Sequence, residues 1–167
     1  MTARPSLLSC SRGAAAAEMA LILPFLIVLL FGSVELGYYF YNQHQVVKGV
    51  RDGARFASRQ PFTAIGCNGT TPIVDAATTT AIREITRTGA VSGGVPRVPG
   101  WEASDIAIDV VCDADALSNV GIYRDKGNPP RVTISAIVSY NALFGGLGVI
   151  DSTYTLNASQ QAAAMGI

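Results

Sequence analysis

The stretch that decides the fold is AAAAEMALILPFLIVLLFGSV, residues 14–34, in which Glu18 is the only charged residue. A helix of about 20 apolar residues is long enough to cross a bilayer, and this stretch has that length. The aromatic run YYFY at residues 38–41 is typical of the boundary between membrane and water. Pro24 lies inside the stretch and should kink the helix, either as an ordinary kink or as a soft point that helps the helix leave the bilayer. The sequence therefore predicts one membrane-spanning helix, surrounded by membrane lipid.

The helix should continue past the apolar run, over residues 14–60 in all, because Pro61 disfavours helical backbone at the residue before it. Its second half carries an apolar stripe at helical spacing, made of Val46, Val47, Val50, Ala54 and Ala57. A basic stripe runs beside it, made of Lys48, Arg51, Arg55 and Arg59. We expect the apolar stripe to pack on this chain's own domain rather than on a partner helix. The basic stripe then faces water, lipid head groups or the acidic side chains of a partner.

Residues 61–167 are expected to form one domain, because about 100 residues suffice for a single small core. Apolar and polar residues alternate over residues 105–112, 132–139 and 153–158. Such alternation predicts three β-strands with one apolar face each, and the three can form an antiparallel meander.

A second helix is predicted over residues 72–88. Thr71 suits its N-cap, Pro72 its first helical position and Gly89 its C-cap. The apolar stripe of this helix should comprise Val74, Ala77, Ala81 and Ile85. The fold class is therefore α+β: a long N-terminal transmembrane and stalk helix, a small antiparallel sheet of about three strands, and a second helix.

Three cysteines fall on the two sides of the apolar run: Cys10 precedes it, whereas Cys67 and Cys112 follow it. If the residues after the helix are exported to an oxidising compartment, Cys67 and Cys112 can form a disulfide, and Cys10 stays on the other side. The disulfide would join the sheet to the loop around Cys67. The alternative is three unrelated thiols.

Composition and motifs argue against several function classes. Twelve basic and twelve acidic residues balance, so net charge indicates no nucleic-acid partner. His44 is the only histidine and no Cys/His cluster is present, which argues against a zinc site. Asp113 and Asp115 alone are too few ligands for calcium. We expect no catalytic residue, no cofactor, no metal and no small-molecule substrate.

Small residues precede the apolar run instead of following it. A secretory signal peptide has its cleavage site after the apolar segment, but residues 32–37, GSVELG, contain no clear site. Any cut should therefore fall near Gly13. It would remove residues 1–13 as a short basic leader and leave the helix on the mature chain.

A cut between Gly13 and Ala14 makes Glu18 the fifth residue of the mature chain. A carboxylate near the end of a membrane helix is costly unless it is paired. The α-amino group created at Ala14 is a cation that could pair with Glu18, within one chain or from a neighbouring subunit. The alternative is that Glu18 only reaches toward the membrane interface.

These features together resemble the TadE family. The strongest similarity lies in residues 12–59, and a weaker one lies near the C-terminus. Ser11 and Met19 depart from the family pattern, which commonly has a basic residue and a phenylalanine there. The segments that carry the resemblance are RGAAAAEMALILPFL from Arg12, FGSVELG from Phe31, RDGARFA from Arg51, YNALFGGLG from Tyr140 and LNAS from Leu156.

The resemblance implies a pilin-like fold, a function and partners. TadE-like proteins are minor pilins or pseudopilins of the tight-adherence (Tad, Flp or type IVc) pilus, and they are implicated in pilus assembly, surface adhesion and biofilm formation. A prepilin peptidase would cut between Gly13 and Ala14, and other minor pilins and pilus subunits would be the partners. The chain would lie in the inner membrane or in the pilus, with a cytoplasmic N-terminus and residues 61–167 outside. The competing hypothesis is an uncleaved, membrane-anchored extracytoplasmic domain that binds or senses a ligand.

The distribution of positive charge conflicts with this orientation. Arg4 and Arg12 precede the helix, whereas the four cations of the basic stripe follow it. Counted naively, the positive-inside rule favours the opposite orientation. The resemblance and the positions of the cysteines favour a cytoplasmic N-terminus, and we therefore expect that orientation.

Overall fold

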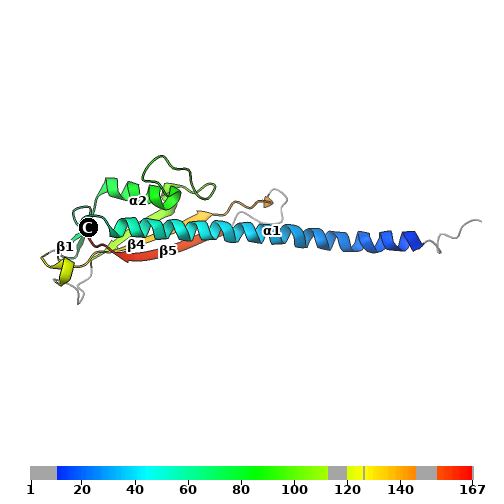
Figure 1. Cartoon of the computed structure of the whole chain (residues 1–167), viewed down its shortest axis with the longest axis horizontal. Helices are drawn as coiled ribbons and strands as arrows, with labels where there is room; N and C mark the ends of the chain where they lie inside the picture. Colours follow the sequence, from blue (N-terminus) through cyan, green and yellow to red (C-terminus); the bar gives the residue numbers. More distant parts are fainter. Residues whose placement is uncertain (1–10, 113–119, 126, 146–153, 167) are drawn as a thin grey trace, which may run out of the picture. The chain divides into compact units, whose positions relative to one another are not determined.

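The computed structural model describes residues 11–112, 120–125, 127–145 and 154–166 (Figure 1). The chain divides into two compact units, Met1–Tyr38 and Tyr39–Ile167. The predicted α+β class is confirmed, with a long apolar N-terminal helix, a second helix and small antiparallel sheets. The elements are α1 (Ser11–Ser58), β1 (Ile65–Asn68), β2 (Thr71–Val74), α2 (Ala76–Thr88), the 3-10 helix η2 (Ala103–Asp105), β3 (Ile106–Val111), the 3-10 helix η3 (Gly121–Tyr123), β4 (Arg131–Ser139) and β5 (Thr155–Ala163).

The main sheet of the C-terminal unit is an antiparallel meander in the order β3-β4-β5, as the alternating pattern predicted. Its register places Ile106 opposite Ala136, and Val138 opposite Leu156. Alternate side chains therefore reach one face and are buried there: Ile106, Val110, Val132, Ile134, Ala136, Val138 and Leu156. This face is one wall of the core.

The last strand is longer than its apolar pattern predicted. The pattern ended at Ala158, but β5 continues to Ala163, which pairs with Arg131. Residues 159–161, SQQ, are polar and exposed. They are in a strand because β4 offers them a hydrogen-bonding edge, a long-range effect that local hydrophobicity does not report.

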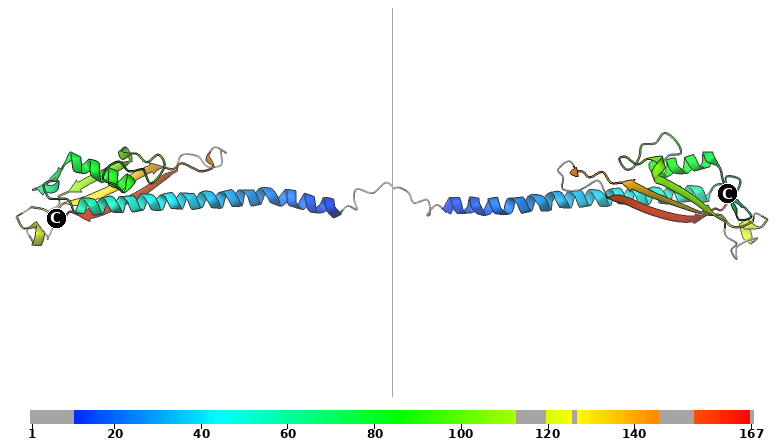
Figure 2. Two further views of the ribbon diagram at one scale, coloured as in Figure 1. Left: turned by 45° about the horizontal axis from the view of Figure 1, so that its top comes forward. Right: turned by 180° about the vertical axis from the view of Figure 1, so that it is seen from behind.

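The C-terminal part of α1 lies along this sheet (Figures 1 and 2). Most of the predicted apolar stripe packs within the chain: Val46, Val50, Ala54 and Ala57 are buried, whereas Val47 is half-buried. Gly53 lets α1 approach the sheet closely, because a Cβ atom there would lie 3.3 Å from Ile134 of β4. A Cβ atom at Gly49 would lie 2.7 Å from the Trp101 ring, which is outside the sheet. The basic stripe, residues 48, 51, 55 and 59, is exposed.

Residues 71–74 form a strand, so the helix predicted to begin at Pro72 is wrong there. β1 and β2 pair antiparallel, with Asn68 opposite Thr71, and Gly69 takes a left-handed φ of 62° in the two-residue turn. Pairing with β1 outweighs the local tendency of Thr71-Pro72 to start a helix. Helix α2 instead begins after Asp75, whose carboxylate accepts the Thr78 N–H at 2.8 Å.

The buried face of α2 also differs from the predicted stripe. The buried residues are Ile82 and Thr86, whereas Val74 and Ala77 are exposed. The Thr86 hydroxyl tolerates burial because it donates to the Ile82 carbonyl oxygen at 2.7 Å. The predicted C-cap is correct: Gly89 is left-handed, and its N–H donates to the Ile85 carbonyl oxygen.

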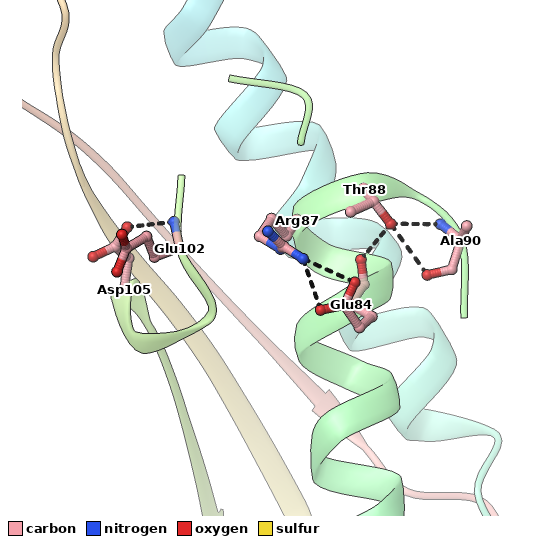
Figure 3. Close-up of polar contacts among 6 residues, drawn as sticks. All are labelled: Glu84, Arg87, Thr88, Ala90, Glu102 and Asp105. Atoms are coloured by element: carbon pink, nitrogen blue, oxygen red, sulfur yellow. Dashed lines mark hydrogen bonds and ion pairs between the residues drawn. The ribbon is translucent and has the colours of Figure 1, made fainter. Parts of the chain in front are cut away.

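Local hydrogen bonds hold the chain after α2 (Figure 3). The Thr88 hydroxyl donates to the Glu84 carbonyl oxygen at 2.7 Å and accepts the Ala90 N–H at 3.1 Å. Farther along, the Asp105 carboxylate accepts the Glu102 N–H at 2.8 Å and starts η2. These contacts lie at the two ends of a segment rich in glycine and proline, residues 89–102, which connects α2 to η2.

Candidate functional site on the first helix

The first part of the candidate site is the segment of α1 in the N-terminal unit. Every side chain from Gly13 to Val34 is exposed, including Phe25 at 66% and Leu29 at 69%. Removing apolar surface from water is favourable by about 25 cal/mol of free energy per Å². An exposed apolar run of this length therefore requires a lipid or protein environment. Within the described ranges, α1 from Gly13 onward is the helix long and apolar enough to cross a membrane by length and composition.

The residues predicted for processing lie together at the start of α1. The helix begins at Ser11, so Gly13, Ala14 and Glu18 all belong to it. Ala14 and Glu18 are four residues apart and therefore neighbours on one helix face. Gly13 is open, because a Cβ atom there would meet nothing within 4 Å. Cleavage and the pairing of Glu18 stay predictions, and residues 1–10 of the leader lie outside the described residues.

Pro24 lies inside α1, which has helical residues on both sides of it. Proline removes one hydrogen bond from a helix, and the apolar neighbours of Pro24 provide no side-chain acceptor or donor in its place. A kink at Pro24 stays a prediction.

A disulfide joins Cys67 and Cys112 with their Cα atoms 5.8 Å apart, and this is the pair that the sequence predicted. It connects the β1–β2 hairpin to the end of β3. The Asn128 side chain strengthens this junction, because its amide donates to the Gly69 carbonyl oxygen at 3.1 Å. Cys10 lies outside the described residues.

The second part of the candidate site lies in the C-terminal unit. A pocket of about 310 Å³ lies between α1 and β5, and we call it the basic groove. Another of about 300 Å³ lies farther along α1, beside His44 and Lys48. The first is lined by Arg51, Ala54, Arg55, Ser58, Gln160, Gln161 and Ala162. The sequence indicated Arg51 and Arg55 as part of the basic stripe. It did not indicate the residues of β5 that line the other side of the pocket, residues 160–162, because they lie beyond the predicted end of the strand.

The cations of the groove have no acidic partner in the part of the chain that the structure describes. Asp52 is the nearest carboxylate in sequence, but it pairs with Arg97 at 2.7 Å. The other ion pair given by the structure joins Arg87 to Glu84 at 2.8 Å. The positive charge of the basic stripe is therefore available to another molecule.

The described residues contain no group of three or more His, Cys, Asp or Glu side chains that could hold a metal ion. Asp113 and Asp115 lie outside the described residues.

Comparison with known proteins bears on the first part of the site. A family model described as TadE-like protein matches residues 13–55. No curated protein and no solved structure matches the chain. The matched segment includes Gly13, Ala14, Glu18, Pro24 and the arginines at 51 and 55. Residues 13–55 are thus TadE-like, as the sequence motifs predicted.

Proposed function

We propose that this chain is a minor pilin or pseudopilin that takes part in assembly of a Tad (Flp, type IVc) pilus and supports surface adhesion and biofilm formation. The observation that carries the proposal is the TadE-like match over residues 13–55. It falls on a helix whose apolar side chains are exposed from residue 13 to residue 34. The role is structural and uses no catalytic residue or cofactor.

An exposed apolar helix suits a subunit that moves from a membrane into a fibre. In the bilayer its side chains contact lipid, and in a fibre they contact the helices of neighbouring subunits. Glu18 in lipid costs about 3 kcal/mol near the centre of a helix, and less near its end. A cationic α-amino group at Ala14 of a neighbouring subunit would offset this cost and favour assembly.

The proposed location is the inner membrane, with a cytoplasmic N-terminus and an extracytoplasmic C-terminal unit. The disulfide between Cys67 and Cys112 supports this orientation, because disulfides persist in oxidising compartments. The basic stripe lies in a folded unit with a core of its own, and long domains cross a membrane largely regardless of their charge. Its four cations therefore weigh little against a cytoplasmic N-terminus.

The proposed partners are a prepilin peptidase, other Tad minor pilins and pilus subunits, and membrane lipid. The peptidase would act first, because the Ala14 α-amino group exists only after the cut. Assembly with other subunits would follow.

N-terminal sequencing of the chain extracted from its native membranes tests the proposal. We expect a mature chain that begins at Ala14. Gly13→Val should prevent the cut, whereas Gly32→Val should be processed normally. A Cβ atom at either glycine would have nothing within 4 Å, so neither substitution causes an intramolecular clash. Cells with only Gly13→Val should also lose surface pili.

A chain that starts at Met1 or Thr2 in a cell with active peptidase would contradict the processing step. It would favour the competing hypothesis of an uncleaved, membrane-anchored binding or sensing domain. Normal piliation after deletion of the gene would contradict the pilus role itself.

A further inference from the structure

Strand β5 has an open edge. In the described sheet its neighbour is β4. The Tyr140 N–H donates to the Tyr154 carbonyl oxygen at 2.9 Å, and the Ala164 N–H donates to the Pro130 carbonyl oxygen at 2.9 Å. Because hydrogen-bonded positions alternate along an antiparallel strand, even-numbered residues of β5 bond to β4. The odd-numbered residues direct their N–H and C=O groups to the open edge: Asn157, Ser159, Gln161 and Ala163.

Helix α1 runs beside this edge and touches it at two points. The Gln43 amide donates to the Asn157 carbonyl oxygen at 2.7 Å. At the other end, the Met165 N–H donates to the Ser58 carbonyl oxygen at 2.7 Å. Between these points Ser159 is exposed. The Gln161 carbonyl oxygen accepts the exposed side chain of Gln160 at 3.1 Å, a bond that another donor can replace.

The wall opposite the open edge is cationic. Arg51 and Arg55 line the pocket of about 310 Å³ together with Gln160 and Gln161. Neither arginine has an acidic partner among the described residues. The groove therefore presents backbone hydrogen-bonding groups on one side and positive charge on the other.

The two walls have matching repeats. Arg51 and Arg55 are one helical turn apart, about 6 Å along the axis at 1.5 Å per residue. Side chains on one face of a strand repeat about every 6.7 Å, two residues at about 3.3 Å each. Acidic residues at alternate positions of an added strand would therefore meet both arginines. A lipid head group offers no such row of backbone donors and acceptors.

We propose that this groove binds an extended acidic segment of another polypeptide chain, which adds as a strand beside β5 and places alternate carboxylates on Arg51 and Arg55. Strand addition of this kind takes affinity from backbone hydrogen bonds and specificity from alternate side chains. Charge complementarity selects acidic segments over neutral ones.

The test uses the full chain in non-ionic detergent micelles and a fluorescent octapeptide of alternating threonine and glutamate. Fluorescence anisotropy should detect binding that weakens with added salt. An octapeptide of alternating threonine and lysine should bind at least about tenfold more weakly, because it loses the charge-assisted hydrogen bonds to the arginines. The acidic octapeptide with alternate backbone amides N-methylated should also bind at least about tenfold more weakly, because it loses backbone hydrogen bonds to β5. Equal binding of the N-methylated peptide would overturn strand addition.

Two matched pairs of variants locate the site. Arg55→Glu should weaken binding of the acidic octapeptide about tenfold or more, whereas Arg124→Glu makes the same charge change at an exposed position outside the groove and should have little effect. Gln161→Pro removes an N–H that points away from β4 and should abolish binding. Gln161→Ala keeps that N–H and should bind normally. Circular dichroism and an intact disulfide identify variants that are folded.

Three results would overturn the proposal: no binding of the acidic octapeptide, equal weakening by Arg55→Glu and Arg124→Glu, or full binding by folded Gln161→Pro. Binding of short-chain phosphatidylglycerol in an Arg55-dependent way, without peptide binding, would identify a lipid site instead. Peptide binding in micelles requires no pilus, so a negative result leaves the pilus role untouched.

Discussion

Gly53 of α1 lies so close to Thr86 of α2 that a Cβ atom at position 53 would overlap the Thr86 hydroxyl oxygen. Thr86 is fully buried, and its hydroxyl is held by the Ile82 carbonyl oxygen at 2.7 Å. One turn earlier, Gly49 meets the Thr86 carbonyl oxygen and the Trp101 ring. The two glycines let the helices approach more closely than any larger residue would allow.

Gly53→Ala should therefore destabilise the C-terminal unit by about 1–3 kcal/mol, the usual cost of overpacking a core. Helix propensity alone would stabilise Gly53→Ala, because alanine is favoured over glycine in a helix by up to about 1 kcal/mol. The expected destabilisation therefore has the opposite sign to the propensity effect. Denaturant unfolding of the full chain in micelles, followed by fluorescence of the single tryptophan, Trp101, measures it. Gly37→Ala is the control, because a Cβ atom there meets nothing within 4 Å. Unchanged or increased stability of Gly53→Ala would refute the steric explanation.

Loss of the disulfide should destabilise the same unit. Cys67 and Cys112 are 45 residues apart, and closing a loop of that length in the unfolded chain is worth about 4 kcal/mol in the chain-entropy model. Cys67→Ser combined with Cys112→Ser should lower the free energy of unfolding by about 2–4 kcal/mol, whereas Cys10→Ser should not. Peptide mapping without reduction provides the independent check, since free thiols at both positions after export would show that the bond does not form in the cell.

Asp75 should make the stability of α2 depend on acid pH. The Thr78 backbone N–H, and then its hydroxyl, hold the pKa of Asp75 below its ordinary value of 3.8. Because the folded-state pKa is lowered, ionised Asp75 stabilises the fold fully above pH 3.8, and this contribution is lost as the pH falls through the lowered pKa.

Melting temperatures of the native chain and Asp75→Ala check this dependence. The native chain should melt higher at pH 7, and the difference should shrink in acid. Asp75→Asn keeps an acceptor without a charge, so its difference from Asp75→Ala should stay constant with pH. If the difference in melting temperature between the native chain and Asp75→Ala grows as the pH falls, the prediction is wrong.

Glu18→Ala should leave membrane insertion intact and impair assembly. Removal of a carboxylate makes the helix more apolar, so the chain should stay in the membrane fraction after alkaline extraction. The α-amino group at Ala14 of a neighbouring subunit would lose its partner, and we expect fewer surface pili and weaker co-purification of pilus subunits. Asp109→Ala, which removes an exposed carboxylate from the sheet, is the control. Normal piliation by Glu18→Ala would count against the pairing.

The sequence by itself determined the features that depend on side-chain pattern. Glu18 is the only charged residue among residues 14–34, which are otherwise almost entirely apolar, and a run of this length predicts a membrane helix. Alternation identified β3 and β4 and the first part of β5, because each buries one face. Gly89 marked the end of α2, since few other residues accept a left-handed C-cap.

Only the tertiary structure decided the features that depend on residues distant in sequence. Pairing with β1 made residues 71–74 a strand and moved the start of α2 to Ala76. Pairing with β4 extended β5 through the polar residues 159–161, and so built one wall of the basic groove. The close approach of Gly53 to Thr86 is of the same kind. Backbone hydrogen bonds and steric fit between separate elements leave little trace in local hydrophobicity, so these features became visible only when the elements were packed together.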